Sequence, residues 1–176
     1  ANRPIVISSA INEFPAVNFN GTSHFLNLTS GLTDLTSGFA CFAVFKPIGT
    51  VAGTMFATGN TGPSDLVSLE INNTQAQFNA FSGTTASSVT TSAGALSLND
   101  FQSIDAVHNG VGSASITVNS TASGTGTVQN LLNTARTQNY IGTNSTSSGF
   151  WRGHLAELLV YSRTVTPSEQ AAIEAY

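Results

Sequence analysis

GHLAELLVYSRTVTPSEQAAIEAY, residues 153–176, is the stretch that decides the fold of this chain. Its first half is an apolar run typical of a β-strand, and its second half begins with a helix start signal. Thr166, Pro167 and Glu169 match a capping box: the threonine accepts from a helical amide, the proline opens the first turn, and the glutamate reaches back to the cap. The stretch therefore predicts a strand followed by a short helix that packs against a sheet.

Glu157 is the carboxylate inside that apolar run. Strand alternation places Leu155, Leu159 and Tyr161 on the same face as Glu157. A buried carboxylate must be hydrogen-bonded or paired, so we expect Arg163, or backbone amides of an adjacent loop, to be its partner. Because no second acid lies beside it on this strand, Glu157 is interpreted as a structural residue rather than a catalytic acid.

The composition of the whole chain favours β-structure. Of the 176 residues, 40% are apolar and only 8% are charged, against about 25% charged residues in a typical soluble domain. The polar part is mostly serine, threonine, asparagine and glycine, which favour turns and edges over helix interiors. Turn signals recur at roughly 8–12 residues, the spacing of a sandwich or a barrel. Residues 1–176 are therefore predicted to form a single all-β domain.

Three internal segments carry specific predictions. Residues 39–45, FACFAVF, are apolar on both strand faces, so this strand is expected to be central and covered on both sides. Residues 15–28, PAVNFNGTSHFLNL, indicate two strands joined by a tight hairpin turn at Asn20 and Gly21, which both tolerate positive φ. Residues 120–126, STASGTG, are low in complexity and are expected to form a loop.

The charge pattern limits the partners of the chain. The net charge is −4 and the five lysine and arginine residues are scattered, so no basic patch exists for nucleic acid. The longest apolar run is far shorter than the roughly 20 residues that span a bilayer, and no membrane insertion is expected. Cys41 is the single cysteine, which excludes an intrachain disulfide and indicates a buried, inert thiol. Low charge and neutral polar loops favour an extracellular location, at a cell surface or a virion surface.

Three segments match one known pattern. Residues 15–28 are similar to an opening strand pair with Phe-Asp-Gly, and residues 101–120 to a middle hairpin that ends in Val-Asn-Gly. Residues 151–176 match a closing signature of aromatic, glycine, an apolar pair around glutamate, tyrosine, arginine and a capped helix. With these segments the chain resembles the laminin G-like, concanavalin A-like jelly-roll superfamily, in its bacterial and phage branch. The resemblance implies two packed antiparallel sheets with a short C-terminal helix. The family signature normally continues past Tyr176, which implies a domain excised from a longer protein.

The resemblance also raises the question of a structural calcium ion, because many relatives bind one. Asn20 stands where the family often has aspartate, and Ser120 stands where it usually has glycine; the first departure does not support carrying the site over. Calcium takes six to eight oxygen ligands, many of which can be backbone carbonyls. The loop at residues 59–65, GNTGPSD, could supply some of them, so a structural calcium ion is compatible with the sequence without being placed by it.

Catalysis is not expected. Relatives that cleave glycosidic bonds carry an E-x-D-x-x-E motif, which is absent here. A retaining reaction needs two carboxyls about 5 Å apart, but Asp65 and Glu70 are five positions apart, as are Asp100 and Asp105, so a regular strand sends each pair to opposite faces. There is no G-x-S-x-G nucleophile motif, and the three histidines are far apart in the sequence. The acidic side chains are therefore predicted to be too poorly aligned to cooperate.

Sugar recognition requires an aromatic platform with a few amides or hydroxyls. Trp151 is the first candidate for that platform, although its position in the closing signature also indicates the core, and Tyr140 and His108 near loop ends are alternative contacts. We interpret the chain as a non-catalytic recognition module of a surface protein that binds glycan or mediates adhesion to a cell or neighbouring protein. The alternative is a structural module, such as a decoration or spike domain of a virion or a spacer of an adhesin, without a small ligand. The oligomeric state is left open.

Overall fold

The computed structural model describes residues 2–29, 31–50 and 52–175. These residues form mainly β-strands with a single short helix near the C-terminus. In chain order the elements are β1 (Ile5–Ile11), β2 (Phe14–Asn20), β3 (Leu26–Asn27), β4 (Phe39–Pro47), β5 (Ala52–Asn60), β6 (Ser64–Asn72), β7 (Gln75–Ser82), β8 (Thr85–Thr90), β9 (Gln102–His108), β10 (Ser113–Val118), β11 (Thr121–Thr127), β12 (Gln138–Ile141), β13 (Arg152–Tyr161) and α1 (Pro167–Glu174).

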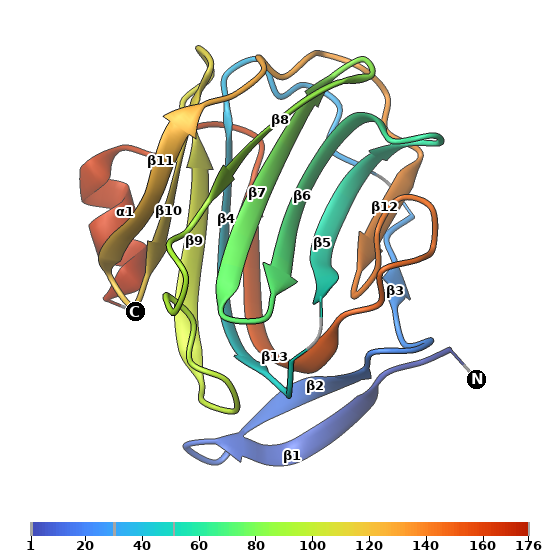
Figure 1. The fold of residues 1–176 in the computed structure, drawn as a ribbon, viewed down its shortest axis with the longest axis vertical. Coiled ribbons are helices and arrows are strands. Elements are labelled where there is room, and N and C mark those ends of the chain that lie inside the picture. Colours follow the sequence, from blue (N-terminus) through green and yellow to red (C-terminus); the bar gives the residue numbers. More distant parts are fainter. Residues whose placement is uncertain (1, 30, 51, 176) are drawn as a thin grey trace.

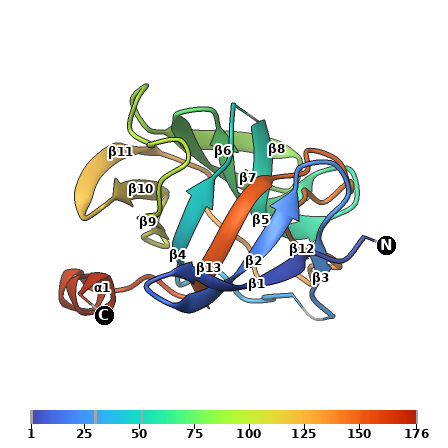
Figure 2. The same cartoon turned by 90° about the horizontal axis from the view of Figure 1, so that it is seen from below.

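The strands form two antiparallel sheets that pack face to face (Figure 1). The seven-stranded sheet has the order β1-β2-β13-β4-β9-β10-β11, and the six-stranded sheet has the order β3-β12-β5-β6-β7-β8. Seen from below, α1 lies on the outer side of the seven-stranded sheet (Figure 2). The predicted all-β jelly-roll sandwich with a short C-terminal helix is confirmed. In the described part of the chain, no helix has the length and apolar character needed to cross a membrane.

The main core fills the space between the sheets. Phe39 on β4 stacks against Phe56 of β5 and Phe78 of β7, with 5.9 Å between ring centroids in both pairs. The outer face of β4 is also covered, because Phe42 belongs to a second buried cluster that Ile173 of α1 packs against. The central strand predicted from FACFAVF is therefore confirmed. Burial raises the pKa of the Cys41 thiol to about 12, as expected for an inert core cysteine.

The turn at Asn20 differs from the predicted hairpin. β2 pairs with β13 in the seven-stranded sheet, whereas β3 pairs with β12 in the six-stranded sheet, so residues 21–25 cross between sheets. The Asn20 side-chain oxygen accepts from the backbone amides of Thr22, Ser23 and His24, each at 3.0 Å. All three of these donors belong to the turn itself, so the Asn20 side chain stabilises the crossing between the sheets. The true hairpin joins β1 to β2, through Asn12 and Glu13 at positive φ.

The segment predicted as a loop at residues 120–126 is a strand. β11 pairs antiparallel with β10, after a tight turn in which Asn119 and Ser120 have φ of 47° and 57°. The low-complexity composition concealed the strand because small residues are poor strand formers, and pairing with β10 supplied the missing stabilisation. Ser120 thus adopts the left-handed conformation that glycine would adopt more easily.

A β-bulge in β13 changes the face on which Glu157 lies. The pairing of β13 with β4 shifts register between Leu155 and Glu157, so Leu155 packs in the main core. Leu159 and Tyr161, beyond the bulge, pack against the outer cluster under α1. The prediction that Leu155 shares a face with Glu157 is wrong, because an extra residue in one strand reverses the alternation.

The helix α1 begins with the predicted capping box. The Glu169 amide donates to the Thr166 hydroxyl at 3.2 Å, and the Thr166 amide donates to the Glu169 carboxylate at 2.8 Å. Arg163 also donates to Glu169, at 2.8 and 3.0 Å, and the pKa of this carboxyl is lowered to about 2, first by Arg163 and then by the Thr166 amide. The expectation that Arg163 pairs with Glu157 is therefore wrong: the arginine is committed to the helix cap.

Candidate functional site

Trp151 lies in the core and not at the surface. Its exposed fraction is 1%, and its ring packs against Phe19 and Phe45 with centroid separations of 5.5 and 6.2 Å. The indole Nε1 has no hydrogen-bond acceptor among the described residues. The ring therefore offers no face to a ligand in solvent, in line with its position in the closing signature.

His108 and Tyr140 are also largely enclosed. The His108 side chain is fully buried, with Nε2 3.0 Å from the Gln129 carbonyl and Nδ1 2.9 Å from the Gly110 amide. This arrangement holds a neutral imidazole, and burial lowers its pKa. Tyr140 is buried on β12, where its hydroxyl donates to the Gln138 side chain at 2.5 Å. The three predicted contacts are not brought together into one site.

The structure instead forms a groove on the outer face of the six-stranded sheet. It lies between β6, β7 and the loop at residues 142–150, which joins β12 to β13. Its volume is about 240 Å³, and its walls carry one half-buried aromatic ring, one carboxylate and several amides and hydroxyls. The lining residues are Pro63, Leu66, Glu70, Asn79, Phe81, Asn144, Ser145 and Thr146.

Strand alternation explains which side chains reach this groove. Val67 and Leu69 of β6 face the core, so Ser68 and Glu70 face outward. By the same alternation Phe78 of β7 faces inward, and Gln77, Asn79 and Phe81 face outward. The sheet register then places Ser68 opposite Asn79 and Glu70 opposite Gln77.

These outward polar groups form a directed chain of hydrogen bonds. Gln77 donates to Asn79 at 2.7 Å, Asn79 donates to the Ser68 hydroxyl at 3.0 Å, and Ser68 donates to Glu70 Oε1 at 3.2 Å. The donors therefore point along the sheet toward Glu70, which is the terminal acceptor. A carboxylate with spare lone pairs at the end of such a chain is suited to accept from ligand hydroxyl groups.

The loop over the groove is fixed by its own side chains. The Asn144 side-chain oxygen accepts from the Thr146 amide at 3.1 Å, from the Thr146 hydroxyl at 2.9 Å and from the Ser148 amide at 2.9 Å. The loop is also tied to β5, because the Thr54 amide donates to the Gly149 carbonyl at 2.9 Å. The wall is therefore ordered by its own hydrogen bonds, which is the kind of preorganisation that lowers the ordering cost of binding.

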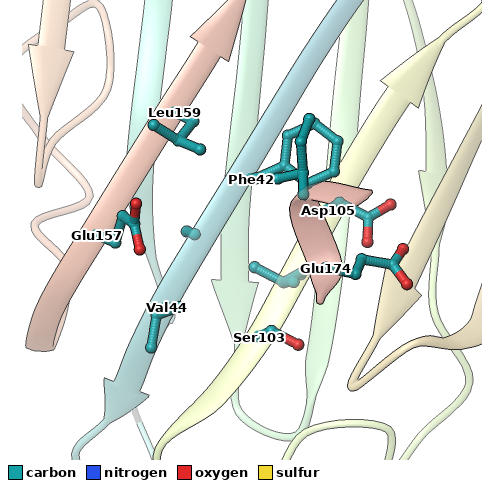
Figure 3. Close-up of a pocket in the computed structure, with 10 residues that line it drawn as sticks. Phe42, Val44, Ser103, Asp105, Glu157, Leu159 and Glu174 are labelled. Carbon is teal, nitrogen blue, oxygen red and sulfur yellow. The ribbon is translucent and has the colours of Figure 1, made fainter. Parts of the chain in front are cut away.

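A second hollow lies on the outer face of the seven-stranded sheet, beside α1. Figure 3 shows Glu157 on β13, Phe42 and Val44 on β4, Asp105 on β9, and Glu174 reaching in from the helix. Gln170 of α1 joins two of the acids: its side-chain amide donates to Asp105 Oδ2 at 2.9 Å and to Glu174 Oε1 at 3.1 Å. The sequence did not indicate this proximity, because it is helix docking that places Glu174 next to Asp105.

Asp105 is the strongly perturbed acid of this hollow. Its exposed fraction is 3%, and its pKa is raised to about 7, first because burial disfavours the carboxylate and next because Glu174 repels it. Glu157 is separated from Asp105 by two strand spacings across the sheet and by two residues along β9. This corresponds to roughly 12 Å between the backbones of the two acids. No hydrogen bond to Glu157 is formed by the described residues, so the predicted partner of this residue is not found.

The acidic hollow lacks the geometry for glycoside cleavage. Its cavity of about 80 Å³ is much smaller than the groove of about 240 Å³ on the six-stranded sheet. A sugar ring must lie between two cooperating carboxyls, whereas Asp105 and Glu174 are bridged by Gln170 and covered by the helix. The two acids are thus held together by the packing of the helix on the sheet.

Comparison with known proteins places this sandwich in a family. A laminin G-type family model, described as the concanavalin A-like lectin/glucanases superfamily, matches residues 20–169. The chain belongs to the concanavalin A-like lectin/glucanases superfamily. A search of curated protein sequences finds no match for this superfamily member.

Solved structures share the concanavalin A-like fold at low sequence identity. Domain 4 of an extracellular arabinanase from Geobacillus stearothermophilus, solved with arabinotriose, has a TM-score of 0.74 and 17% identity over 100% of this chain and 82% of that one. Domains LG4-5 of the mouse laminin α1 chain have a TM-score of 0.66 and 18% sequence identity, over 86% of this chain and 44% of the laminin chain. The CBM40 domain of the Ruminococcus gnavus IT-sialidase has a TM-score of 0.65 and 12% sequence identity, over 85% of this chain and 96% of that domain. The chain thus spans less than half of the laminin fragment.

The groove of this concanavalin A-like domain was not predicted from the sequence. Alternation along residues 68–70 and 77–81 does contain a signal, because every second residue is polar or aromatic on the face opposite the core. The missing information was the register between the two strands and the position of the loop at residues 142–150. Both depend on contacts between residues far apart in the chain.

Proposed function

We propose that the chain is a non-catalytic recognition module that binds glycan in the groove on the outer face of the six-stranded sheet. The observation that carries this proposal is the partly exposed Phe81 ring beside Asn79, Glu70 and the loop residues Asn144 and Thr146. An apolar ring face next to amide and carboxylate groups is the combination that sugars require, because they have both apolar faces and hydroxyl rims.

The family supports the same proposal. Among the similar structures, domain 4 of an arabinanase was solved with arabinotriose, and another is the CBM40 domain of a sialidase. The place of such a module would be extracellular, on a cell or virion surface, with a glycan or a surface protein as its partner. Nucleic acid is not proposed as a partner, since the net charge is −4 and phosphate contacts require clustered cations.

A glycan array with the isolated domain tests the proposal, followed by titration calorimetry on any sugar that binds. Phe81→Ala is expected to weaken binding by roughly 5-fold or more, on the order of 1 kcal/mol for a lost stacking contact. Phe14→Ala is the matched control, because Phe14 is 70% exposed on the seven-stranded sheet. Equal affinities of the Phe81→Ala variant and the unaltered domain would remove the groove from the proposal.

One observation favours the alternative of a structural module. The hairpin of β1 and β2 presents Ile5, Val6 and Phe14 to solvent, with exposed fractions of 60%, 67% and 70%. Large apolar side chains gathered at an edge are typical of protein–protein contacts. If no sugar binds in the array, this hairpin becomes the leading candidate for attachment to a neighbouring protein of a virion or adhesin.

A further inference from the structure

The groove on the outer face of the six-stranded sheet carries a negative charge without a compensating cation. Glu70 is its single ionisable lining residue within the described part of the chain, and neither lysine, arginine nor histidine lines it. We infer that the groove selects neutral glycans over anionic ones, such as sialylated or uronic sugars, and that Glu70 is the residue that determines this specificity. The inference rests on the proposed glycan-binding function and adds the chemical class of the ligand.

The cationic residues of the chain are engaged elsewhere. Arg136 is buried, and its guanidinium donates to the backbone carbonyls of Asp65, Leu32 and Thr33 at 2.9–3.0 Å. Arg163 is paired with Glu169. An anionic sugar in the groove would therefore meet a carboxylate and no partner charge. Its own carboxylate would also lose hydration without gaining a charge-assisted hydrogen bond.

The remaining cations lie on or next to the seven-stranded sheet. Lys46 is the next-to-last residue of β4, and its Nζ lies 5.8 Å from the centroid of the Phe101 ring. Arg152 begins β13, and Arg3 precedes β1. None of these side chains belongs to the groove between β6, β7 and the loop.

The hydrogen bonds beneath the groove strengthen this selectivity. The chain of hydrogen bonds from Gln77 through Asn79 and Ser68 ends on Glu70 Oε1. The Glu70 carboxylate can therefore only accept hydrogen bonds, and a ligand group beside it must be a donor. Sugar hydroxyls can donate, whereas a ligand carboxylate cannot. Asn79 and Asn144 also line the groove, but their side-chain amides already take part in the hydrogen bonds of the sheet and the loop.

The test compares pairs of probes in which one member is neutral and the other carries carboxylate groups. Galactan with galacturonan oligosaccharides, and lactose with sialyllactose, are titrated against the domain at low and high salt. At low salt the neutral member is expected to bind roughly 3- to 30-fold more tightly than the acidic one. This range follows from the Coulomb repulsion between the Glu70 carboxylate and a ligand carboxylate about 8 Å away, in a partly aqueous site. Raising the salt to about 1 M, where screening acts over about 3 Å, is expected to reduce this ratio.

Two variants separate the local charge from the net charge. Glu70→Gln keeps the shape and is expected to bring the two members of each pair to within about 2-fold, because the repulsion is removed. Asp100→Asn removes the same charge from an exposed loop away from the groove and is expected to leave the ratio unchanged. Equal changes in both variants would show that net charge acts, and would overturn the role of Glu70.

The outcomes distinguish this inference from the function on which it rests. Tighter binding of the acidic member of a pair overturns the selectivity while leaving glycan binding intact. If the domain binds none of the neutral or acidic probes, the proposed glycan binding is overturned, and the inference with it. Preference for the neutral member that disappears in Glu70→Gln supports both.

Discussion

Replacement of Asp105 by asparagine should remove a large part of the pH dependence of the domain's stability. The pKa of this carboxyl is raised to about 7, against about 3.9 in an unfolded chain. Between these values the folded state binds a proton that the unfolded state has released. The contribution of Asp105 to stability is therefore fully present below about pH 4 and is lost as the pH rises through 7.

The two pKa values set the size of the effect. About three pH units, at about 1.36 kcal/mol each, give up to about 4 kcal/mol by pH 8. Asparagine is neutral at every pH and keeps the shape of the side chain, so it can stay beneath Gln170 and Glu174. We expect Asp105→Asn to match the unaltered domain near pH 4 and to be more stable at pH 8, with a difference on the order of 3–4 kcal/mol.

Urea denaturation followed by the fluorescence of the buried Trp151 measures this difference across the pH range. His108 acts in the opposite direction, since burial lowers its pKa and its protonation destabilises the fold as the pH falls; the comparison of two proteins that both contain it cancels its effect. Asp100→Asn, at an exposed position, controls for net charge. Glu174→Gln is expected to recover part of the stability at pH 8, because it removes the repulsion.

The refuting result is clear in the same data. If the stabilities of the unaltered domain and Asp105→Asn run parallel from about pH 4 to pH 8, Asp105 does not titrate in this range in the folded state. The same conclusion follows if the variant is the less stable protein at pH 8. Either result would mean that α1 does not cover Asp105 in solution as it does here.

Two further substitutions test the packing and the turn. Gly153→Ala would place a methyl group 2.4 Å from Trp151 Cζ2 and 2.5 Å from the Lys46 carbonyl oxygen. We expect the free energy of unfolding, measured by urea denaturation, to fall by about 1–3 kcal/mol. Gly126→Ala, whose added methyl group has its nearest contact at 3.1 Å, is expected to cost far less. Asn20→Asp would present a carboxylate to three backbone amides and is expected to stabilise the fold by about 1 kcal/mol at pH 7. That gain should be lost as the pH falls through the lowered pKa of the new carboxyl, and its absence at pH 7 would contradict the hydrogen bonding of the turn.

Sequence alone determined those features that depend on neighbouring residues. The double-sided apolar run of residues 39–45 identified the central strand, because alternation fixes the faces of a strand without reference to the rest of the chain. The capping box of Thr166 and Glu169 located the start of α1 for the same reason, since its hydrogen bonds join residues three apart. The closing signature that contains these residues also indicated the family.

Tertiary structure decided everything that joins distant segments. One extra residue in β13 places Glu157 on the opposite face of the sheet from Leu155. No local sequence pattern predicts such a bulge. The groove combines residues 63–81 with residues 144–146, and the acidic hollow brings Glu174 of the helix to Asp105 of β9. Alternation gives the face of a side chain but not its partner across the sheet. Strand register and the docking of loop and helix, which are set by packing over long sequence separations, create both sites.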